Sequence, residues 1–100
     1  MKKEKQSNAK LSTLKTLYHL PETTTPEELE MHWSTVLTFE NHVLLAGYYY
    51  AGPGKNNYFG AIYGFATDDH TCEGEIRLEK ISTEMFPDNG TAIAWCIQSL

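Results

Sequence analysis

Hydrophobic positions near the start of the chain recur at helical spacing. Between residues 8 and 20 they fall mostly three or four positions apart, which would place them on one face of a helix: Leu11, Leu14, Leu17, Tyr18 and Leu20. Pro21 would end that helix, because proline lacks the backbone N–H that an interior turn needs. Thr25 then precedes Pro26, and Glu28 lies three positions after the threonine. Since this order is typical of a helix N-terminus, we expect a second helix to begin there.

After the second helix the pattern changes to that of strands. Residues 34–40 fit both a helix and one face of a strand, but their β-branched run favours a strand. Two apolar, aromatic runs, residues 43–51 and 58–66, lie on either side of the turn-rich loop 52–57 and predict a β-hairpin. Residues 75–79 alternate polar and apolar side chains, as a half-exposed strand does.

The last segment, residues 91–100, fits two structures. Ile93, Trp95 and Ile97 alternate as in a strand. The same two isoleucines also form a helical stripe with Cys96 and Leu100, and Thr91 is available as the N-cap. We prefer the strand. In either structure these apolar residues would belong to the core.

Together these elements predict an α+β fold. One or two N-terminal helices would pack on a four- or five-stranded antiparallel, meander-like β-sheet. The lysine-rich residues 1–8 would form a flexible basic arm, and residues 9–100 a single domain, because 100 residues with 41% hydrophobic side chains suit one core. The N-terminal sequence lacks the apolar core of a signal peptide and no segment is long enough to span a bilayer, which favours a cytoplasmic protein without membrane contact. We expect Cys72 and Cys96 to be reduced thiols.

Charge is distributed unevenly along the chain. Residues 1–20 carry a balance of +4 and residues 21–100 a balance of −9, which together give the net charge of −5. An acidic body repels the phosphates of nucleic acids and attracts basic surfaces. The charge therefore predicts a protein partner with a basic surface and argues against direct nucleic-acid binding.

Three features of the sequence suggest catalytic or ligand-binding chemistry, but each lacks residues that the corresponding motif requires. The loop 52–57 contains glycines and a lysine, but Asn56 stands where a phosphate-binding loop needs Ser or Thr, and a strand follows the loop. The cluster of metal-ligand types in residues 68–75 is single, whereas structural zinc draws on two paired clusters. No local signature surrounds Cys72 or Cys96. We therefore expect neither a catalytic residue nor a metal nor a cofactor.

Aromatic residues gather on both strands of the predicted hairpin. Strand alternation sends about half of these rings to each face of the sheet. Either one face presents tyrosines to solvent or to a partner, or both faces are covered or the rings only stiffen the hairpin as cross-strand pairs. Tyrosine combines apolar area with a hydroxyl group and is enriched at interfaces. Such a face would equally serve a homodimer.

These features favour a small, acidic, non-enzymatic protein-binding module. It would act as a stoichiometric inhibitor, for example a phage- or plasmid-type blocker of a nucleic-acid-processing enzyme, an anti-defence protein, or an immunity or antitoxin protein. The alternative is a small-ligand-binding domain or small enzyme with a Tyr/His pocket between helix and sheet. Aromatic anchors and carboxylates would make the partner contacts: Tyr48, Tyr50, Tyr58, Glu27, Glu28, Glu30, Asp68, Asp69, Glu73, Glu75 and Glu79.

Overall fold

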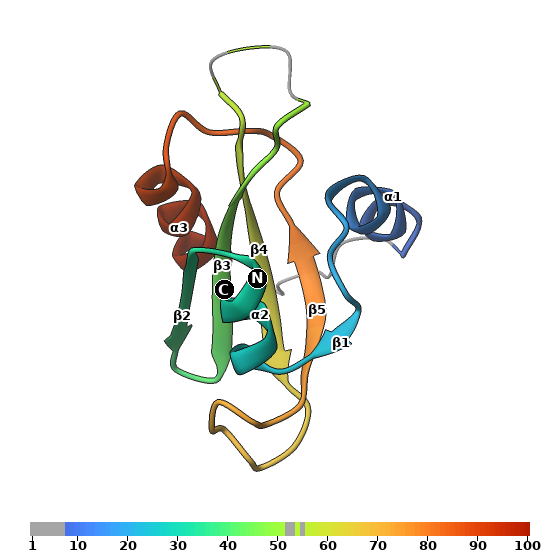
Figure 1. Cartoon of the computed structure of the whole chain (residues 1–100), viewed down its shortest axis with the longest axis vertical. Coiled ribbons are helices and arrows are strands. Elements are labelled where there is room, and N and C mark those ends of the chain that lie inside the picture. The colour runs from blue at the N-terminus through green and yellow to red at the C-terminus, as the bar shows by residue number, and fades with distance from the viewer. Residues whose placement is uncertain (1–7, 52–53, 55) are drawn as a thin grey trace, which may run out of the picture.

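The computed structural model describes residues 8–51, 54 and 56–100. The arm predicted for residues 1–8 lies outside the described residues except for Asn8, and so does part of the 52–57 loop. Figure 1 shows the chain order of the elements, which are α1 (Asn8–Tyr18), β1 (Thr23–Thr24), α2 (Pro26–His32), β2 (Thr35–Phe39), β3 (His42–Tyr48), β4 (Tyr58–Phe65), β5 (Ile76–Ile81) and α3 (Asn89–Gln98).

The strands form one antiparallel sheet in the order β1-β5-β4-β3-β2. The predicted α+β class and the meander of strands β2 to β5 are confirmed. Strand β1 has only two residues, Thr23 and Thr24, which pair with Arg77 and Ile76 at the edge of β5. Two residues are too few to produce a periodic pattern, so this strand could not be predicted from the sequence.

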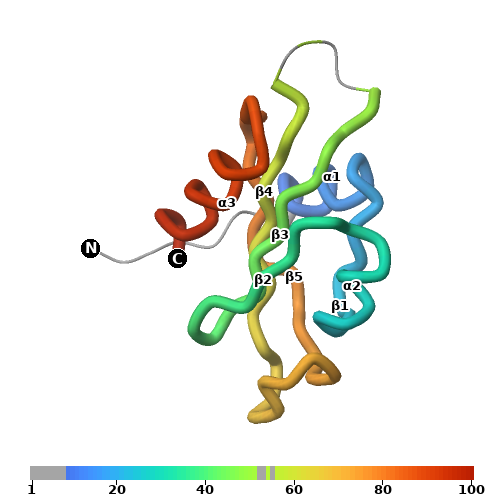
Figure 2. Tube along the Cα trace, turned by 60° about the vertical axis from the view of Figure 1, so that its left-hand side comes forward, coloured from blue at the N-terminus to red at the C-terminus, as the bar shows by residue number. Residues whose placement is uncertain are grey.

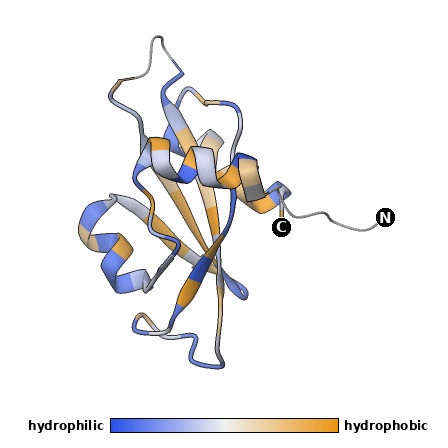
Figure 3. Cartoon of the chain, turned by 90° about the vertical axis from the view of Figure 1, so that its right-hand side faces the viewer, coloured by the Kyte–Doolittle hydropathy of each residue, from blue (hydrophilic) through white to orange (hydrophobic). Residues whose placement is uncertain are grey.

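Helices cover both faces of the sheet, so that the domain has three layers. Figure 2 shows α1 and α2 on one side of the strands and α3 on the other. Alternation along β3 supplies both cores: Val43 and Leu45 join the cluster under α1 and α2, whereas Leu44 and Ala46 pack towards α3. Figure 3 shows much of the hydrophobic colour on the central strands of the sheet.

The two N-terminal helices are held by local contacts that the sequence predicts. The Thr25 hydroxyl accepts a hydrogen bond of 3.2 Å from the backbone N–H of Glu28, which caps α2. Helix α1 ends at Tyr18, one residue before His19, whose φ of 58° is left-handed. The predicted end near Pro21 is therefore two to three residues late.

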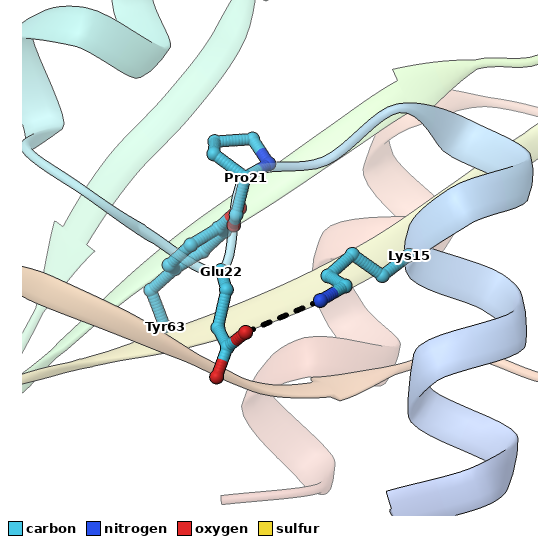
Figure 4. Close-up of polar contacts among 4 residues, drawn as sticks. All are labelled: Lys15, Pro21, Glu22 and Tyr63. Carbon is cyan, nitrogen blue, oxygen red and sulfur yellow. Dashed lines mark hydrogen bonds and ion pairs between the residues drawn. The ribbon is translucent and has the colours of Figure 1, made fainter.

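The segment after α1 is fastened to the sheet. The Lys15 Nζ atom lies 3.2 Å from the Glu22 Oε1 atom. Figure 4 shows this ion pair, with Tyr63 beside Pro21. The Tyr63 hydroxyl donates a hydrogen bond of 2.7 Å to the Pro21 carbonyl oxygen. Burial raises the pKa of the Tyr63 hydroxyl, so the group remains a donor throughout the neutral range.

The strand preferred for residues 91–100 is wrong, because residues 91–98 belong to α3. The helix is capped three residues earlier than Thr91: the Asp88 carboxylate accepts a 2.8 Å hydrogen bond from the Thr91 backbone N–H. Its buried stripe, Ala92 and Cys96, lies against Gly60, where an added Cβ would be 2.9 Å from the Ala92 carbonyl oxygen. This segment therefore forms a helix and not a strand, because its small residues let α3 pack close to β4.

Helix α3 shows that both faces of the sheet are covered, which is one of the two alternatives that the sequence left open. It covers the face opposite α1 and α2, and Tyr63 points into the core under the N-terminal helices. Only the upper end of the hairpin in Figure 1 leaves tyrosines accessible: Tyr48 is 38% and Tyr50 88% exposed.

Candidate functional site

The eleven predicted contact residues fall into separate groups. The three tyrosines, Tyr48, Tyr50 and Tyr58, lie together at the end of the sheet where β3 leads into β4. The carboxylates of the 66–75 loop lie at the opposite end, where β4 leads into β5. The sequence therefore identified two surfaces rather than one continuous site.

Two segments that are distant in sequence meet at the acidic end. The Glu27 backbone N–H donates a 2.9 Å hydrogen bond to the Cys72 carbonyl oxygen, which places the first turn of α2 beside the 66–75 loop. Hydrogen bonds from the Thr71 side chain and backbone hold the pKa of Asp69 below its ordinary value, so this carboxylate stays charged. We call the exposed carboxylates here the acidic end: Glu27, Glu28, Glu30, Asp68, Asp69 and Glu73.

The other two predicted carboxylates are occupied by neighbours. The Glu75 carboxylate lies 3.1 Å from the Arg77 guanidinium. The Glu79 carboxylate lies over Gly64 and 3.5 Å from the His42 Nε2 atom, on the α3 face of the sheet. Neither carboxylate is part of the acidic end.

The accessible tyrosines line a hollow that also involves the end of α2. Two adjoining cavities, of about 600 and 660 Å³, share four lining residues, which we call the aromatic groove: His32, Trp33, Tyr48 and Tyr50. A third cavity of about 690 Å³ continues from His32 and Trp33 towards the segment between α1 and β1. The groove is therefore built where α2, the β3–β4 hairpin and the end of α1 meet.

Trp33 is fixed in the groove by backbone and ring contacts. Its backbone N–H donates a 2.9 Å hydrogen bond to the Leu29 carbonyl oxygen at the end of α2. Its ring meets Phe59 edge to face, with centroids 5.7 Å apart, and Phe59 in turn stacks on Tyr18 at 3.9 Å. Gly47 makes room for both rings, since a Cβ there would lie 2.5 Å from Phe59 Cζ and 2.7 Å from Trp33 Cζ3.

The tyrosine wall of the groove is a chain of ring contacts. Tyr48 lies between Tyr50 and Tyr58, with centroid distances of 4.8 and 5.0 Å. The Asn57 side-chain amide donates to the Tyr48 hydroxyl at 3.4 Å, and the Asn57 Oδ1 atom is buried without a hydrogen-bond partner among the described residues. Tyr48 is held in place, whereas Tyr50 presents almost its whole ring to solvent.

The groove differs in charge from the rest of the chain. Among the described residues, no carboxylate lines the two cavities that share all four groove residues, whereas Glu28 lines the third cavity. The polar groups of the first two cavities are His19, His32, Ser34, Thr16 and Asn89 together with the tyrosine hydroxyls. An uncharged ligand, or one with a negative charge, could therefore enter without facing a carboxylate of the lining.

Sequence reasoning missed the residues that give the groove its floor and one side. Neither Trp33 nor His32 is among the residues that the sequence predicts to form a site. Their position at the junction of α2 and β2 was the available signal, because side chains at such a junction escape both periodic patterns. Asn57 fell in the predicted turn, and its burial depends on contacts distant in sequence.

The cysteines do not form a reactive pair. Both are free thiols; Cys72 is exposed at the acidic end and Cys96 is buried under α3. Burial raises the pKa of the Cys96 thiol to about 12. In the described part of the chain no three His, Cys, Asp or Glu side chains are grouped as a metal ion would require, and no helix there has the length and apolar character to cross a membrane.

Fold and groove together define a small α+β domain with helices on both faces of its sheet. Residues 20–100 match the family Nmad4, described as nucleotide modification associated domain 4, and the chain belongs to this family. The matched span begins after α1 and contains all four residues of the aromatic groove. No curated protein and no solved structure matched the chain.

Proposed function

We propose that the chain is a non-enzymatic ligand-binding module whose aromatic groove holds a single nucleobase, as part of a nucleoside or nucleotide. The observation that carries the proposal is the groove itself, in which Trp33, Tyr48 and Tyr50 surround a hollow without carboxylates in an acidic chain. The family description supports this ligand class, because it associates the domain with nucleotide modification.

Physical chemistry favours a planar ring as the occupant. An exposed aromatic side chain such as Tyr50 gains about 1–3 kcal/mol when a base stacks on it. His32 supplies ring nitrogens that can donate or accept hydrogen bonds at the edge of the base. The acidic body disfavours a long polyanion, so the proposal concerns one base and not a nucleic-acid strand.

Fluorescence of Trp33 tests the proposal. Because the chain has two tryptophans, the Trp95→Phe variant leaves Trp33 as the only one. We expect nucleosides to quench its emission in a saturable manner. Tyr50→Ala, which removes the most exposed ring of the groove, should weaken binding about tenfold or more, in line with the stacking energy of a base.

The matched control is Met31→Ala in the same background. Met31 is 70% exposed, precedes His32 on α2 and lines none of the three cavities that adjoin the groove. It should leave the quenching curve unchanged. If the four common nucleosides and their monophosphates produced no saturable quenching, or if Tyr50→Ala bound as well as the parent, the proposal would be wrong.

A second candidate function concerns the acidic end. The hydrogen bond from Glu27 to Cys72 joins carboxylates of α2 and the 66–75 loop into one surface, which supports docking on the basic surface of a protein partner. A nucleic-acid-processing enzyme, which the module would inhibit stoichiometrically in a phage- or plasmid-borne setting, is such a partner.

Affinity capture at low and moderate salt tests this second function. A basic partner should be retained at low salt and lost at moderate salt, because contacts between exposed charges are screened. The double reversal Asp68→Lys and Asp69→Lys should abolish retention, whereas Glu84→Lys, an exposed carboxylate outside the acidic end, should preserve it. Retention that survives the double reversal would refute docking through this surface.

A further inference from the structure

We infer that a second copy of this chain pairs with the outer edge of β2, so that two sheets join into one across a two-fold axis near Leu37. The inference rests on a different surface from the aromatic groove and does not depend on the proposed function. The contact would combine strand pairing with packing between the α3 helices of the two copies.

The outer edge of β2 is available for pairing. The strand is the last in the order β1-β5-β4-β3-β2, so within the described chain it has a neighbour on one side only. In an antiparallel pair alternate residues direct their backbone N–H and C=O groups away from the partner strand. Such an edge is a template for a further strand unless it is blocked.

The residues of the strand itself include none that usually block an edge. Residues 35–39 read Thr-Val-Leu-Thr-Phe and contain no proline, no glycine and no charged side chain. The other edge of the sheet, by contrast, is β1, which has only two residues. An uncharged edge is notable in a chain of net charge −5, because two copies could approach here without direct repulsion between strand residues.

Helix α3 extends the edge with an apolar stripe. The Asn89 side chain donates a 2.9 Å hydrogen bond to the Thr35 hydroxyl, which fixes the start of the helix beside the start of β2. Phe39 of β2 and Leu100, two residues after the end of α3, both pack against the cluster formed by Leu44, Ile62 and Cys96. Between these points Leu37 remains 37% and Ile97 41% exposed.

A two-fold pair of β2 strands can be centred on Leu37, the middle residue of the strand. If Leu37 faces Leu37 of the second copy in an antiparallel pair, Thr35 faces Phe39 and Val36 faces Thr38. Opposite residues of an antiparallel pair point to the same side of the sheet. Both copies then present Leu37 and the α3 stripe on one side, which is the self-complementarity that a two-fold interface requires.

Sedimentation equilibrium from micromolar to submillimolar concentration tests the inference. The unmodified chain should shift towards twice its mass of 11.4 kDa. Leu37→Lys places two like charges at the axis and should weaken the dimer about 100-fold or more. Met31→Lys adds the same charge at an exposed apolar position on α2 and should leave the equilibrium unchanged.

Cross-linking tests the register directly, and it remains informative if the Leu37→Lys variant does not fold. In a Cys72→Ser background, Leu37→Cys should form a disulfide-linked dimer under mild oxidation, because residues that face each other across a strand pair lie within reach of a disulfide. Leu17→Cys, which is on α1 and similarly exposed, should not. A chain that stays monomeric at every concentration, or equal cross-linking at both positions, would overturn the inference.

Discussion

At the scale of single residues, two glycines set how closely neighbouring groups approach the sheet. Gly47 lies under Trp33 and Phe59, and Gly60 lies under the backbone of α3. They occupy opposite faces, since Gly47 belongs to the Val43 and Leu45 side of β3 and Gly60 packs against Cys96. Each glycine therefore supports a different layer of the fold.

Gly47→Ala should damage the aromatic groove. The added methyl group would overlap Trp33 and Phe59, so we expect the free energy of unfolding to fall by about 1–3 kcal/mol. In the Trp95→Phe background the emission of Trp33 should also shift to longer wavelength as the ring moves outward. Gly54→Ala is the control, because no atom lies within 4 Å of a Cβ there. Equal stability of the two variants would contradict the close packing of Trp33.

The two thiols should react at very different rates. Cys72 is exposed and should react promptly with a thiol reagent, whereas Cys96 should react only on unfolding. Burial raises the pKa of Cys96 to about 12, so its neutral form stabilises the fold below the ordinary thiol pKa of about 8.5, and this contribution is lost as pH rises through 12. Counting modified thiols with and without urea checks this. Prompt modification of both thiols in the native chain would contradict the burial of Cys96.

At the scale of elements, capping decides which of two periodic patterns is realised. Residues 91–100 satisfy strand and helix spacing equally well, but Asp88 provides an N-cap for the helix. The cap lies before the ambiguous segment, so a search for helix starts within 91–100 finds only Thr91. The strands β3 and β4 were predictable because their apolar runs are long and flank a turn. The position of α3 on the far face depended on Gly60 and could not be read from local spacing.

The α3 cap should make stability depend on pH in acid. Backbone hydrogen bonding from Thr91 lowers the pKa of Asp88 in the folded state, so its contribution is complete above the unfolded value of about 3.9 and is lost as pH falls through the lower, folded value. Asp88→Asn retains the cap but cannot titrate. Urea unfolding at neutral and strongly acid pH should therefore show a smaller loss for Asp88→Asn than for the unmodified chain. Equal losses of stability in the two proteins would show that the titration of Asp88 does not cause the pH dependence.

At the scale of the whole molecule, the fold separates residues that the sequence grouped by chemistry. Tyrosines and carboxylates were predicted together as partner contacts, because composition does not show where a side chain lies in the fold. The meander sends the β3–β4 and β4–β5 connections to opposite ends of the sheet, so the tyrosines and the loop carboxylates cannot touch one common small ligand. The groove could be foreseen only as a Tyr/His pocket between helix and sheet, without Trp33.

The separation predicts that the two surfaces act independently. Tyr50→Ala should weaken binding of a nucleobase and leave capture of a basic protein unchanged, and Asp68→Lys with Asp69→Lys should do the reverse. Effects of changes at distant sites without shared partners usually add to within about 0.5 kcal/mol. The triple variant should therefore show, in each assay, the same loss as the change that acts on that assay alone. A larger loss of nucleobase affinity in the triple variant would mean that the acidic end and the groove are coupled through α2, the one helix whose N-terminus contacts the 66–75 loop and whose C-terminus forms the groove.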